Sequence, residues 1–364
     1  MEFAWLELKD FRSYHELRIE PAPGVNVLVG ANGAGKTNLL EGAAYLASLR
    51  SFRGAPDEAL INDAAEAAII RGEIRHVGSA SLIEAELPRT GRRRVRVNGQ
   101  RPARSTDLLG HVRAVMFLPD DLDIVKRGPA YRRDFLDAVA VQLWPGAYLD
   151  QQEYDRALRQ RNSLLRQSGW EVDLPTLEVW DQRLSQAAGN MMVRRAGVEA
   201  VLRESIAETY ATLSGAGTRV ELHYASKWGG SLQEQNAATV TAKLADALAA
   251  SRRADTERRL TTRGPHRDEP WFAVGGRDAR IRASQGEQRT LALALRLATH
   301  RAISEATGET ALLLLDDVFS ELDMGRANAL AGMLPSAQTF ITTAREEEVP
   351  VHGRTFVVEP GSIR

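Results

Sequence analysis

Residues 30–37 combine glycines, a lysine and a threonine at the spacing that suits binding of nucleotide phosphates. The segment reads Gly-Ala-Asn-Gly-Ala-Gly-Lys-Thr and fits the pattern G-x-x-x-x-G-K-[ST] without deviation. Glycines let backbone N–H groups turn toward a phosphate, and the following helix directs its positive dipole end at the same anion. Lys36 supplies a charge for the β- and γ-phosphates, and the Thr37 hydroxyl supplies a magnesium ligand. The candidate nucleotide contacts are Gly30, Ala31, Asn32, Gly33, Ala34, Gly35, Lys36, Thr37 and Asn38.

Two acidic residues follow an apolar run in the last part of the chain. Residues 311–315 read Ala-Leu-Leu-Leu-Leu and lead directly into Asp316 and Asp317. Such a run predicts a buried parallel strand, which brings its carboxylates to the sheet edge where α/β proteins bind ligands. We assign magnesium binding to Asp316 and activation of the attacking water to Asp317, so Lys36 and Asp317 are the catalytic candidates. The alternative is a strand that simply ends in a polar turn, and the phosphate loop in the same chain argues against it.

A helix start at residues 284–288 is a candidate for a second nucleotide contact. The segment reads Ser-Gln-Gly-Glu-Gln, and a capping box between Ser284 and Glu287 would explain both residues without any ligand. It lies 32 residues before Asp316 (316 − 284), with one helix between them. This arrangement resembles the signature motif of ABC-type ATPases, which senses the γ-phosphate of a nucleotide held by another subunit. The resemblance implies contacts from Ser284, Gly286, Glu287 and Gln288.

Two further segments resemble conserved motifs of ABC-type ATPases. Residues 320–323 read Ser-Glu-Leu-Asp and are similar to the D-loop, which adds Asp323 to the candidate contacts. Residues 340–344 predict the next strand, at whose end ABC proteins usually carry a switch histidine. This chain has Thr343 or Ala344 there, so its switch chemistry departs from the pattern.

The elements that position these residues lie in two strand-rich parts separated by helices. We expect strands at residues 3–9, 17–20, 25–29, 68–74, 81–87, 92–97, 311–317 and 340–344. We expect helices at residues 38–46, 150–167, from about 175 onward, at 237–252 and at 286–305. Residues 68–97 predict an antiparallel meander, Asn98-Gly99 predicts a hairpin turn, and Ser168-Gly169 predicts the end of a helix.

The long central helix carries a weak seven-residue repeat. Leu177, Leu184, Met191 and Val198 recur every seven residues, but Arg194 interrupts the companion positions. The pattern favours a short arm that packs on its neighbours. The predicted fold class is α/β, with an antiparallel β meander, a P-loop ATPase head that resembles the ABC/SMC type, and an inserted helical arm. The expected domains are residues 1–149 (first half of the head), 150–255 (arm) and 256–364 (second half of the head).

Composition limits the classes of protein to which the chain can belong. It has 364 residues, 43% of them apolar, which is enough for a sizeable core. It has no cysteine, which excludes disulfide scaffolds and thiolate zinc sites and is compatible with a reducing cytoplasm. No apolar run approaches the length of a membrane span, so we expect a cytoplasmic protein without a membrane partner. The net charge of −1 means that any DNA binding must come from a local basic patch.

Five short blocks together resemble the RecF family of bacterial recombination mediators. They are Phe11-Arg12-Ser13-Tyr14, Asn38-Leu39-Leu40-Glu41, Arg50-Ser51-Phe52-Arg53, Leu118-Pro119-Asp120-Asp121-Leu122 and Gly264-Pro265-His266-Arg267-Asp268. The resemblance covers both ends of the chain and lacks landmarks only between about residues 150 and 255. It implies an SMC-like head, ATP and Mg2+ as cofactors, an ATP-dependent homodimer and weak DNA-dependent ATP hydrolysis. The implied partners are duplex DNA, including single-strand/double-strand junctions, with RecO and RecR in loading RecA at gaps.

DNA contacts and rival functions remain open at this stage. Phosphate contacts without base readout would suffice for duplex binding. The candidates are Arg50, Arg53, Arg92, Arg94, Arg96, Arg132, Arg133, Arg194, Arg195, Arg252, Arg253, Arg258 and Arg259. The main alternative function is an SMC-like structural DNA tether, against which the shortness of the arm argues. A transporter ATPase subunit fits less well, because the helical insertion is too large.

Overall fold

The computed structural model describes residues 1–167, 173–228, 230–232 and 235–364. By internal contacts the chain divides into two compact units. The first comprises Met1–Asp121, Thr209–Ala216 and Ala292–Arg364, and the second comprises Leu122–Glu208 and Gly217–Leu291. The predicted domains 1–149, 150–255 and 256–364 divide the chain by motif, and their boundaries stay a prediction.

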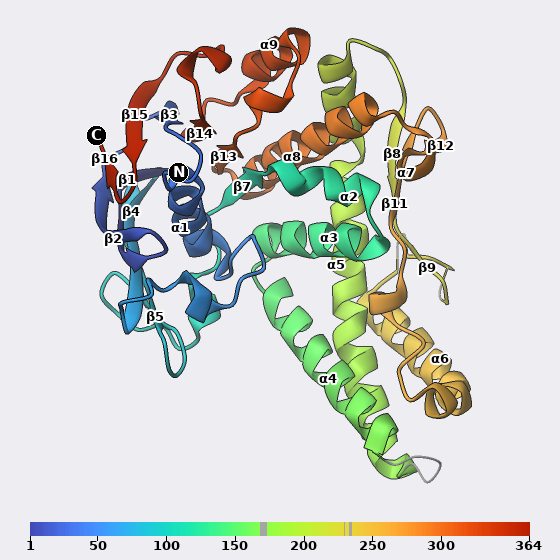
Figure 1. Cartoon of the computed structure of the whole chain (residues 1–364). Helices are drawn as coiled ribbons and strands as arrows, with labels where there is room; N and C mark the ends of the chain where they lie inside the picture. Colours follow the sequence, from blue (N-terminus) through green and yellow to red (C-terminus); the bar gives the residue numbers. More distant parts are fainter. Residues whose placement is uncertain (168–172, 229, 233–234) are drawn as a thin grey trace. The chain divides into compact units, whose positions relative to one another are not determined.

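A mostly parallel sheet forms one layer of the first unit (Figure 1). Its strand order is β16-β15-β3-β14-β13-β7, and only the β15–β16 pair is antiparallel. The strands are β3 (Val25–Val29), β7 (Ala114–Phe117), β13 (Leu312–Asp316), β14 (Thr339–Thr343), β15 (Arg354–Glu359) and β16 (Ser362–Ile363). All five residues of β13 are buried, as its unbroken leucine run requires. The prediction of a buried parallel strand that ends in Asp316 is confirmed.

An antiparallel sheet forms the second layer of this unit. Its order is β2-β1-β4-β5-β6, which confirms the predicted meander. The strands are β1 (Glu2–Phe11), β2 (Tyr14–Ile19), β4 (Ala67–His76), β5 (Ser79–Pro88) and β6 (Arg94–Val97). The strand expected to begin at Arg92 begins at Arg94, because Arg93 turns back and donates to the Tyr45 hydroxyl at 2.9 Å. The hairpin turn is confirmed by the left-handed φ of Asn98 (52°) and Gly99 (76°).

Helix α1 (Lys36–Ser48) lies between the two sheets and contacts β1 and β4 on one side and β13 and β14 on the other. Its residues Leu39, Leu40 and Leu46 are fully buried, as expected for a helix covered on both sides. The approach to β1 is so close that a Cβ at Gly42 would lie 2.5 Å from a methyl carbon of Leu8. This packing fixes the start of α1, and with it the phosphate loop, against both sheets. Helices α8 (Gln285–Thr307) and α9 (Met324–Met333) precede and follow β13.

The second unit is mainly helical. Its helices are α2 (Leu122–Lys126), α3 (Pro129–Leu143), α4 (Ala147–Gln167), α6 (Ala237–Arg258), α7 (Ala279–Arg282) and most of α5 (Leu174–Ser214). It also holds a sheet in the order β12-β11-β8 and a short β9–β10 pair. These strands are β8 (Val220–His223), β9 (Ala225–Ser226), β10 (Gly230–Ser231), β11 (Trp271–Val274) and β12 (Arg277–Asp278).

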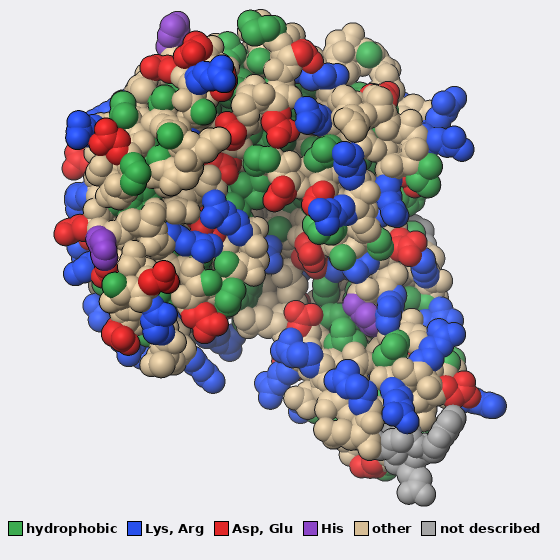
Figure 2. Space-filling view, in the orientation of Figure 1, with side chains coloured by type: hydrophobic (Ala, Val, Ile, Leu, Met, Phe, Trp, Pro, Cys, Tyr) green, Lys and Arg blue, Asp and Glu red, His purple; other side chains and the backbone are tan. Residues whose placement is uncertain are grey.

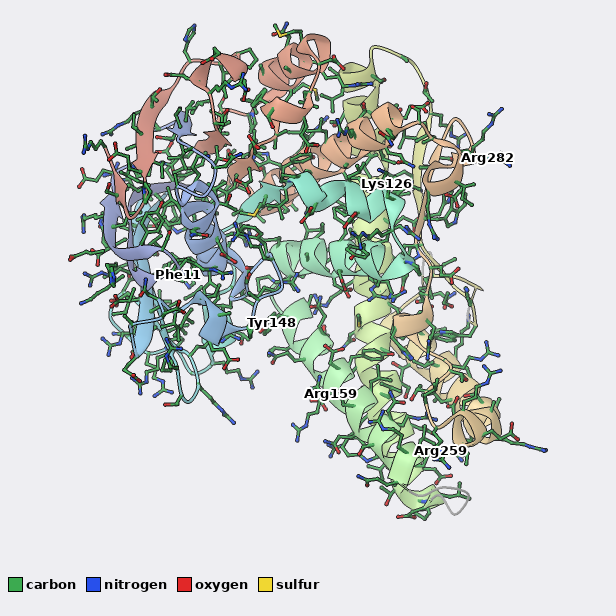
Figure 3. All side chains as sticks on the ribbon, viewed as in Figure 1. Phe11, Lys126, Tyr148, Arg159, Arg259 and Arg282 are labelled. Carbon is green, nitrogen blue, oxygen red and sulfur yellow. The ribbon has the colours of Figure 1, made fainter. Side chains whose placement is uncertain are left out.

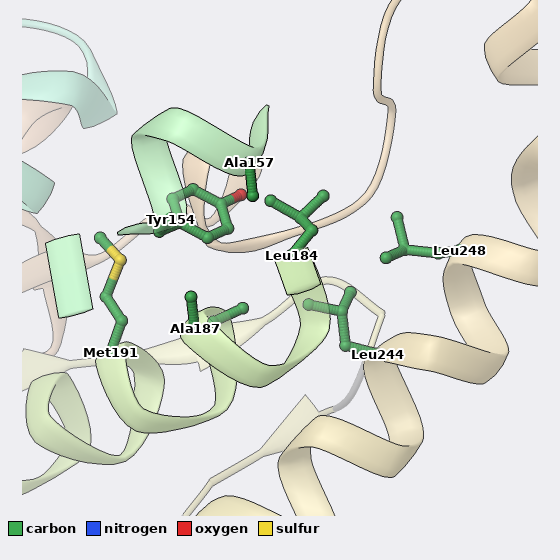
Figure 4. Packing of buried hydrophobic residues seen from close by; sticks show 8 residues of the cluster. Tyr154, Ala157, Leu184, Ala187, Met191, Leu244 and Leu248 are labelled. Carbon is green, nitrogen blue, oxygen red and sulfur yellow. The ribbon is translucent and has the colours of Figure 1, made fainter. Parts of the chain in front are cut away.

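The arm is a packed helical bundle, as the interrupted repeat predicts. Leu184 and Met191 of α5 join Tyr154 of α4 and Leu244 and Leu248 of α6 in one buried cluster (Figure 4). The predicted helix at 150–167 begins earlier, at Ala147, and the predicted Ser168-Gly169 break lies outside the described residues. Across the residues that the structure describes, no helix is both long and apolar enough to cross a membrane.

Candidate nucleotide site and signature helix

The phosphate loop is held in shape by close backbone approaches at two of its glycines. A Cβ at Gly30 would lie 2.3 Å from the carbonyl oxygen of Val358, on the neighbouring strand β15. Gly35 has φ 112°, and a Cβ there would lie 2.8 Å from the Tyr14 hydroxyl, which donates to the Gly35 carbonyl at 3.1 Å. Any larger residue at either position would collide, so both glycines are required by geometry.

Lys36 occupies the interior of the loop. Its Nζ donates to the carbonyl oxygens of Gly30 at 2.6 Å and Ala31 at 3.0 Å. Burial lowers the pKa of Lys36, while the nearby Asp317 and Asp316 carboxylates act in the opposite direction. The lysine is therefore placed where a phosphate entering the loop would meet its ammonium group.

Thr37 and Asp316 meet beside the loop, although 279 positions separate them in the sequence. The Thr37 hydroxyl donates to Asp316 Oδ1 at 2.9 Å, and Thr342 donates to the same oxygen at 2.7 Å. Burial raises the pKa of Asp316, and the two hydroxyl donors and Arg53 moderate that rise. The predicted pair of magnesium ligands is thus brought together in one place.

Asp317 is in an unusual conformation at the end of β13. Its φ of 52° lies in the left-handed region, which non-glycine residues seldom adopt. Its backbone N–H donates to Thr342 Oγ1 at 2.9 Å, and its carbonyl accepts from the Ser320 hydroxyl at 2.8 Å. Its Oδ1 is buried and has no hydrogen-bond partner in the described part of the chain. A buried carboxylate oxygen without a partner is costly, so this atom is suited to receive a water or ligand.

Sequence reasoning did not single out Thr342, and its assignment of the switch position to Thr343 or Ala344 stays a prediction. The Thr343 hydroxyl lies 2.9 Å from the Arg345 carbonyl oxygen and 3.0 Å from the Glu348 carboxylate. Thr342, which faces Asp316 and Asp317, lies opposite Asp316 in the β13–β14 register. That register could have revealed it, since the two strands were both predicted, but their relative alignment was not.

Three of the family-specific blocks converge on the buried carboxylate of Glu41, on α1. Arg12 donates to it with Nε at 2.9 Å and Nη2 at 3.1 Å, and the Ser51 hydroxyl donates at 2.5 Å. Arg53 approaches the same carboxylate at 3.8 Å. The side-chain amide of Asn38 donates to Ser13 Oγ at 2.9 Å, and its predicted contact with nucleotide stays a prediction. These blocks therefore brace the start of α1 directly behind the phosphate loop.

The signature segment forms the capping box that its sequence allows. The Ser284 N–H donates to Glu287 Oε2 at 2.7 Å, and the Glu287 N–H is 3.3 Å from Ser284 Oγ. The hydrogen bonds from Ser284 hold the pKa of Glu287 below its ordinary value. Gln288 is buried and donates its amide to the carbonyl oxygen of Ala279 at 3.0 Å. Ser284 is exposed and Glu287 is half-buried, whereas Gln288 serves to hold α7 against the start of α8.

Asp323, the D-loop candidate, caps helix α9. Its carboxylate accepts from the Arg326 N–H at 3.0 Å and from the Arg326 guanidinium at 2.7 Å. The cap lowers the pKa of Asp323. Asp323 belongs to the first unit and Ser284 to the second.

Most of the block at 264–268 is buried or half-buried in the second unit, and only Arg267 is exposed. His266 Nε2 donates to the Thr261 carbonyl at 3.1 Å, and its Nδ1 accepts from the Tyr154 hydroxyl at 2.5 Å. Burial lowers the pKa of His266 to about 4, so the ring is neutral at physiological pH. Asp268 accepts from the Tyr224 hydroxyl at 2.8 Å. This block therefore connects helix α4 with strand-side residues of the same unit through buried hydrogen bonds.

A phosphate loop between a parallel strand and a helix, an acidic strand beside it, and an antiparallel sheet packed on that helix define a P-loop ATPase head of the ABC/SMC type. The sequence profile of the RecF/RecN/SMC N terminal domain matches residues 3–359. The "DNA replication and repair protein RecF" of Acidothermus cellulolyticus (strain ATCC 43068 / DSM 8971 / 11B) is 41% identical, over 100% of this chain and 99% of that protein. The chain belongs to the RecF family.

Solved structures agree with this assignment. "Structure of the recombination mediator protein RecF-ATP in RecFOR pathway" matches with a TM-score of 0.91 and 31% identity, over 100% of this chain and 96% of that one. The "SmcHead bound to the C-winged helix domain of ScpA" matches with a TM-score of 0.56 and 18% identity, over 100% of this chain and 96% of that one. The second likeness concerns the fold alone.

Proposed function

We propose that this chain is a weak, DNA-stimulated ATPase whose ATP-bound form is a homodimer that holds duplex DNA. The meeting of Thr37 and Asp316 beside the phosphate loop, at 2.9 Å, carries this proposal. A hydroxyl and a carboxylate so placed are the protein ligands that Mg2+ takes beside nucleotide phosphates. The relative described as RecF-ATP supports ATP as the nucleotide.

Magnesium fits the residues present. Among the described residues there is no group of three His, Cys, Asp or Glu side chains that could hold a metal ion. A site in which side chains of these types supply three or more of the metal ligands is therefore absent from this part of the chain. Thr37 and Asp316 would hold the ion together with phosphate oxygens and water, which is the coordination that Mg2+ prefers. Bound there, it would offset negative charge on the β- and γ-phosphates.

The loop residues and Asp317 have separate tasks in this proposal. Lys36 exchanges its bonds to Gly30 and Ala31 for bonds to the β- and γ-phosphates, and the loop N–H groups bind the same oxygens. Asp317 holds a water with its unpartnered carboxylate oxygen and takes a proton as the water oxygen attacks the γ-phosphorus. The bond to the β-phosphate oxygen breaks, and ADP and phosphate leave.

A second copy of the chain completes the site in this proposal. Ser284 is exposed directly before α8 and Glu287 is half-buried in its first turn, where a helix N-terminus attracts anions. Ser284 and Gly286 would contact the partner's γ-phosphate, and Asp323 would lie at the same interface. Gln288 contributes indirectly by holding the helix start in place. Dimerisation then requires ATP, and hydrolysis releases it.

Most of the arginines predicted to contact DNA are already engaged within the chain. Arg132 and Arg195 are buried, Arg133 donates to the Asp268 carbonyl, and Arg194 pairs with Asp150 at 2.8 Å. Arg252 pairs with Asp181 at 3.0 Å, Arg253 with Glu257 at 3.1 Å, and Arg94 with Glu86 at 2.9 Å. The exposed candidates that remain are Arg50, Arg92, Arg96, Arg258 and Arg259.

Helix α4 offers a better duplex contact, which sequence reasoning did not single out. Arg156, Arg159 and Arg166 are exposed, and none is in an ion pair in the described part of the chain. Their spacing places them on one face of α4 over about 15 Å, at about 1.5 Å per residue. Figure 2 shows Lys and Arg side chains gathered over α4 and α6, and Figure 3 marks Arg159 and Arg259 there. We assign phosphate contacts to this α4 stripe.

The remaining parts of the proposal concern partners and cellular place. The names of the relatives, "DNA replication and repair protein" and "RecFOR pathway", support work with RecO and RecR in loading RecA at gapped DNA. We propose single-strand/double-strand junctions as the preferred DNA and the cytoplasm as the location. The tether alternative gains no support, because α4 has 21 residues and packs along its length against the bundle.

Size-exclusion chromatography with ATP and Mg2+, with and without duplex DNA, tests this function. We expect a monomer without nucleotide, a dimer with ATP, and slow ATP turnover that duplex DNA increases. A chain that binds no ATP, or that dimerises equally with and without it, would refute the proposed function.

A further inference from the structure

Thr342 joins the two acidic residues of the site through a single oxygen atom. Its hydroxyl donates to Asp316 Oδ1 at 2.7 Å and accepts from the Asp317 backbone N–H at 2.9 Å. Thr342 is buried and lies on β14, directly opposite Asp316 in the parallel register with β13. No other side chain among the described residues bonds to both of these neighbours.

The two bonds have different consequences for the two acids. Asp316 Oδ1 also accepts from Thr37, so Thr342 fixes the direction from which a metal could approach this carboxylate. Asp317 adopts a left-handed φ of 52°, a conformation that costs a non-glycine residue about 1 kcal/mol or more. A hydrogen bond from the Asp317 N–H is therefore needed to keep its carboxylate on the loop side of the strand.

We propose that Thr342 is a positioning residue that sets the metal-binding carboxylate of Asp316 and the water-activating carboxylate of Asp317 in register with one another. This inference rests on the proposed function. It assigns to Thr342 a task that neither the phosphate loop nor the acidic strand can perform. Thr343, its neighbour, bonds to the turn at 345–348 and has no part in it.

Thr342→Val tests this role, because valine keeps the shape of the side chain and removes the hydroxyl. We expect kcat for ATP to fall about 10- to 100-fold, the loss of one or two bonds to charged or strained groups. KM for MgATP should rise by no more than about tenfold, because only the Mg2+-dependent part of ATP binding is altered while Lys36 and the loop are untouched. Thr342→Ser, which restores the hydroxyl, should recover turnover to within about threefold of the unaltered chain.

Thr339→Val is the matched control, because Thr339 is buried on the same strand and its hydroxyl bonds, among the described residues, only to the Ala337 carbonyl at 3.2 Å. It should lower thermal stability like Thr342→Val and leave kcat unchanged. Equal kcat in Thr342→Val and Thr339→Val, or no recovery in Thr342→Ser, would overturn the proposal.

A binding measurement keeps this inference separate from the proposed function. Calorimetric titration of ATP with and without Mg2+ measures how much the ion tightens binding, and it needs no turnover. We expect Thr342→Val to reduce that Mg2+-dependent gain about tenfold, while binding without Mg2+ stays the same. An unchanged gain refutes the role of Thr342, whereas absence of ATP binding in the unaltered chain refutes the proposed function itself. Should Thr342→Val fail to fold, Thr342→Ala carries the same two measurements.

Discussion

The phosphate-loop region and the signature helix differ in how complete they are within one chain. Around the loop, Thr37, Asp316 and Thr342 come from three segments and already form a connected set of hydrogen bonds. At the signature segment, Ser284 and Glu287 bond to one another, with Ser284 exposed and Glu287 half-buried. One region is a network that joins three segments, and the other is a helix end capped by its own residues.

This difference teaches where binding energy must come from. A preorganised half-site can bind nucleotide as a monomer, since few groups need to be ordered when the ligand arrives. A helix end that is already capped by its own serine contributes little binding free energy within one chain. It contributes when a partner chain brings a phosphate to it. The contrast therefore predicts that nucleotide binding and dimerisation are separable by mutation.

Lys36→Met is expected to have the largest effect and tests the complete region. Methionine keeps much of the length of lysine and removes the charge that would meet the phosphates. ATP affinity should fall about 100-fold or more, with loss of two charge-assisted bonds. Calorimetric titration measures this, and circular dichroism checks that the fold is intact. ATP binding at unchanged affinity would remove the phosphate-loop assignment.

Ser284→Arg tests the incomplete region. The arginine places bulk and charge where a partner's γ-phosphate would lie, so ATP should bind to the monomer with little change while ATP-dependent dimers disappear in sedimentation. Ser284→Ala is the milder comparison, because it removes the cap, at a cost of about 1 kcal/mol, and the hydroxyl contact without adding bulk or charge, so ATP-dependent dimers should weaken but not disappear. Dimers that persist in Ser284→Arg would show that Ser284 is a helix cap and nothing more.

Replacing the two acids sharpens the description of the complete region. Asp317→Asn keeps the shape and loses the base, so ATP and Mg2+ should still bind and closed dimers should accumulate on DNA. Asp316→Asn should instead weaken Mg2+-dependent binding. Dimer lifetime on DNA after an ATP chase distinguishes them. Asp317→Asn dimers that dissociate as fast as those of the unaltered chain, with normal turnover, would place the base elsewhere.

Changes in the arm should have the smallest effect and leave both nucleotide regions unaltered. Replacement of Arg156, Arg159 and Arg166 by alanine should reduce the slope of log affinity for duplex DNA against log salt by about 2 to 3, near 0.9 per phosphate contact. The control replaces Arg18, Arg71 and Arg94 by alanine. These are paired with glutamates on the antiparallel sheet, so the slope should not change. Equal slopes in the two triple variants would exclude the α4 stripe.

The sequence predicted those parts of the fold that local patterns determine. The loop pattern at 30–37, the leucine run before Asp316 and the Asn98-Gly99 turn each contain their own structural reason, and each was found in place. The start of β6 was missed because Arg93 bonds to Tyr45, a residue 48 positions away. Local periodicity carries no information about such a contact.

The residue types of the site could be predicted from the sequence, but the spatial contacts between these residues could be predicted only in part. Thr37 and Asp316 could be paired from motif knowledge, whereas Thr342 required the alignment of two parallel strands. Arginines were also misjudged, because a basic dipeptide such as Arg132-Arg133 looks exposed in sequence and is engaged in the structure. The unpaired arginines of α4 are dispersed at helical spacing and form no run.

Mixing two inactive variants tests most directly whether a second chain completes the nucleotide site. Lys36→Met and Ser284→Arg should each lack ATP turnover alone. In a mixed dimer one site carries both changes and the other carries neither. With random pairing, an equal mixture should therefore recover up to about a quarter of the turnover of the unaltered chain, since half of the dimers are mixed and each has one intact site. A mixture that shows no more turnover than the two variants measured separately would contradict the account.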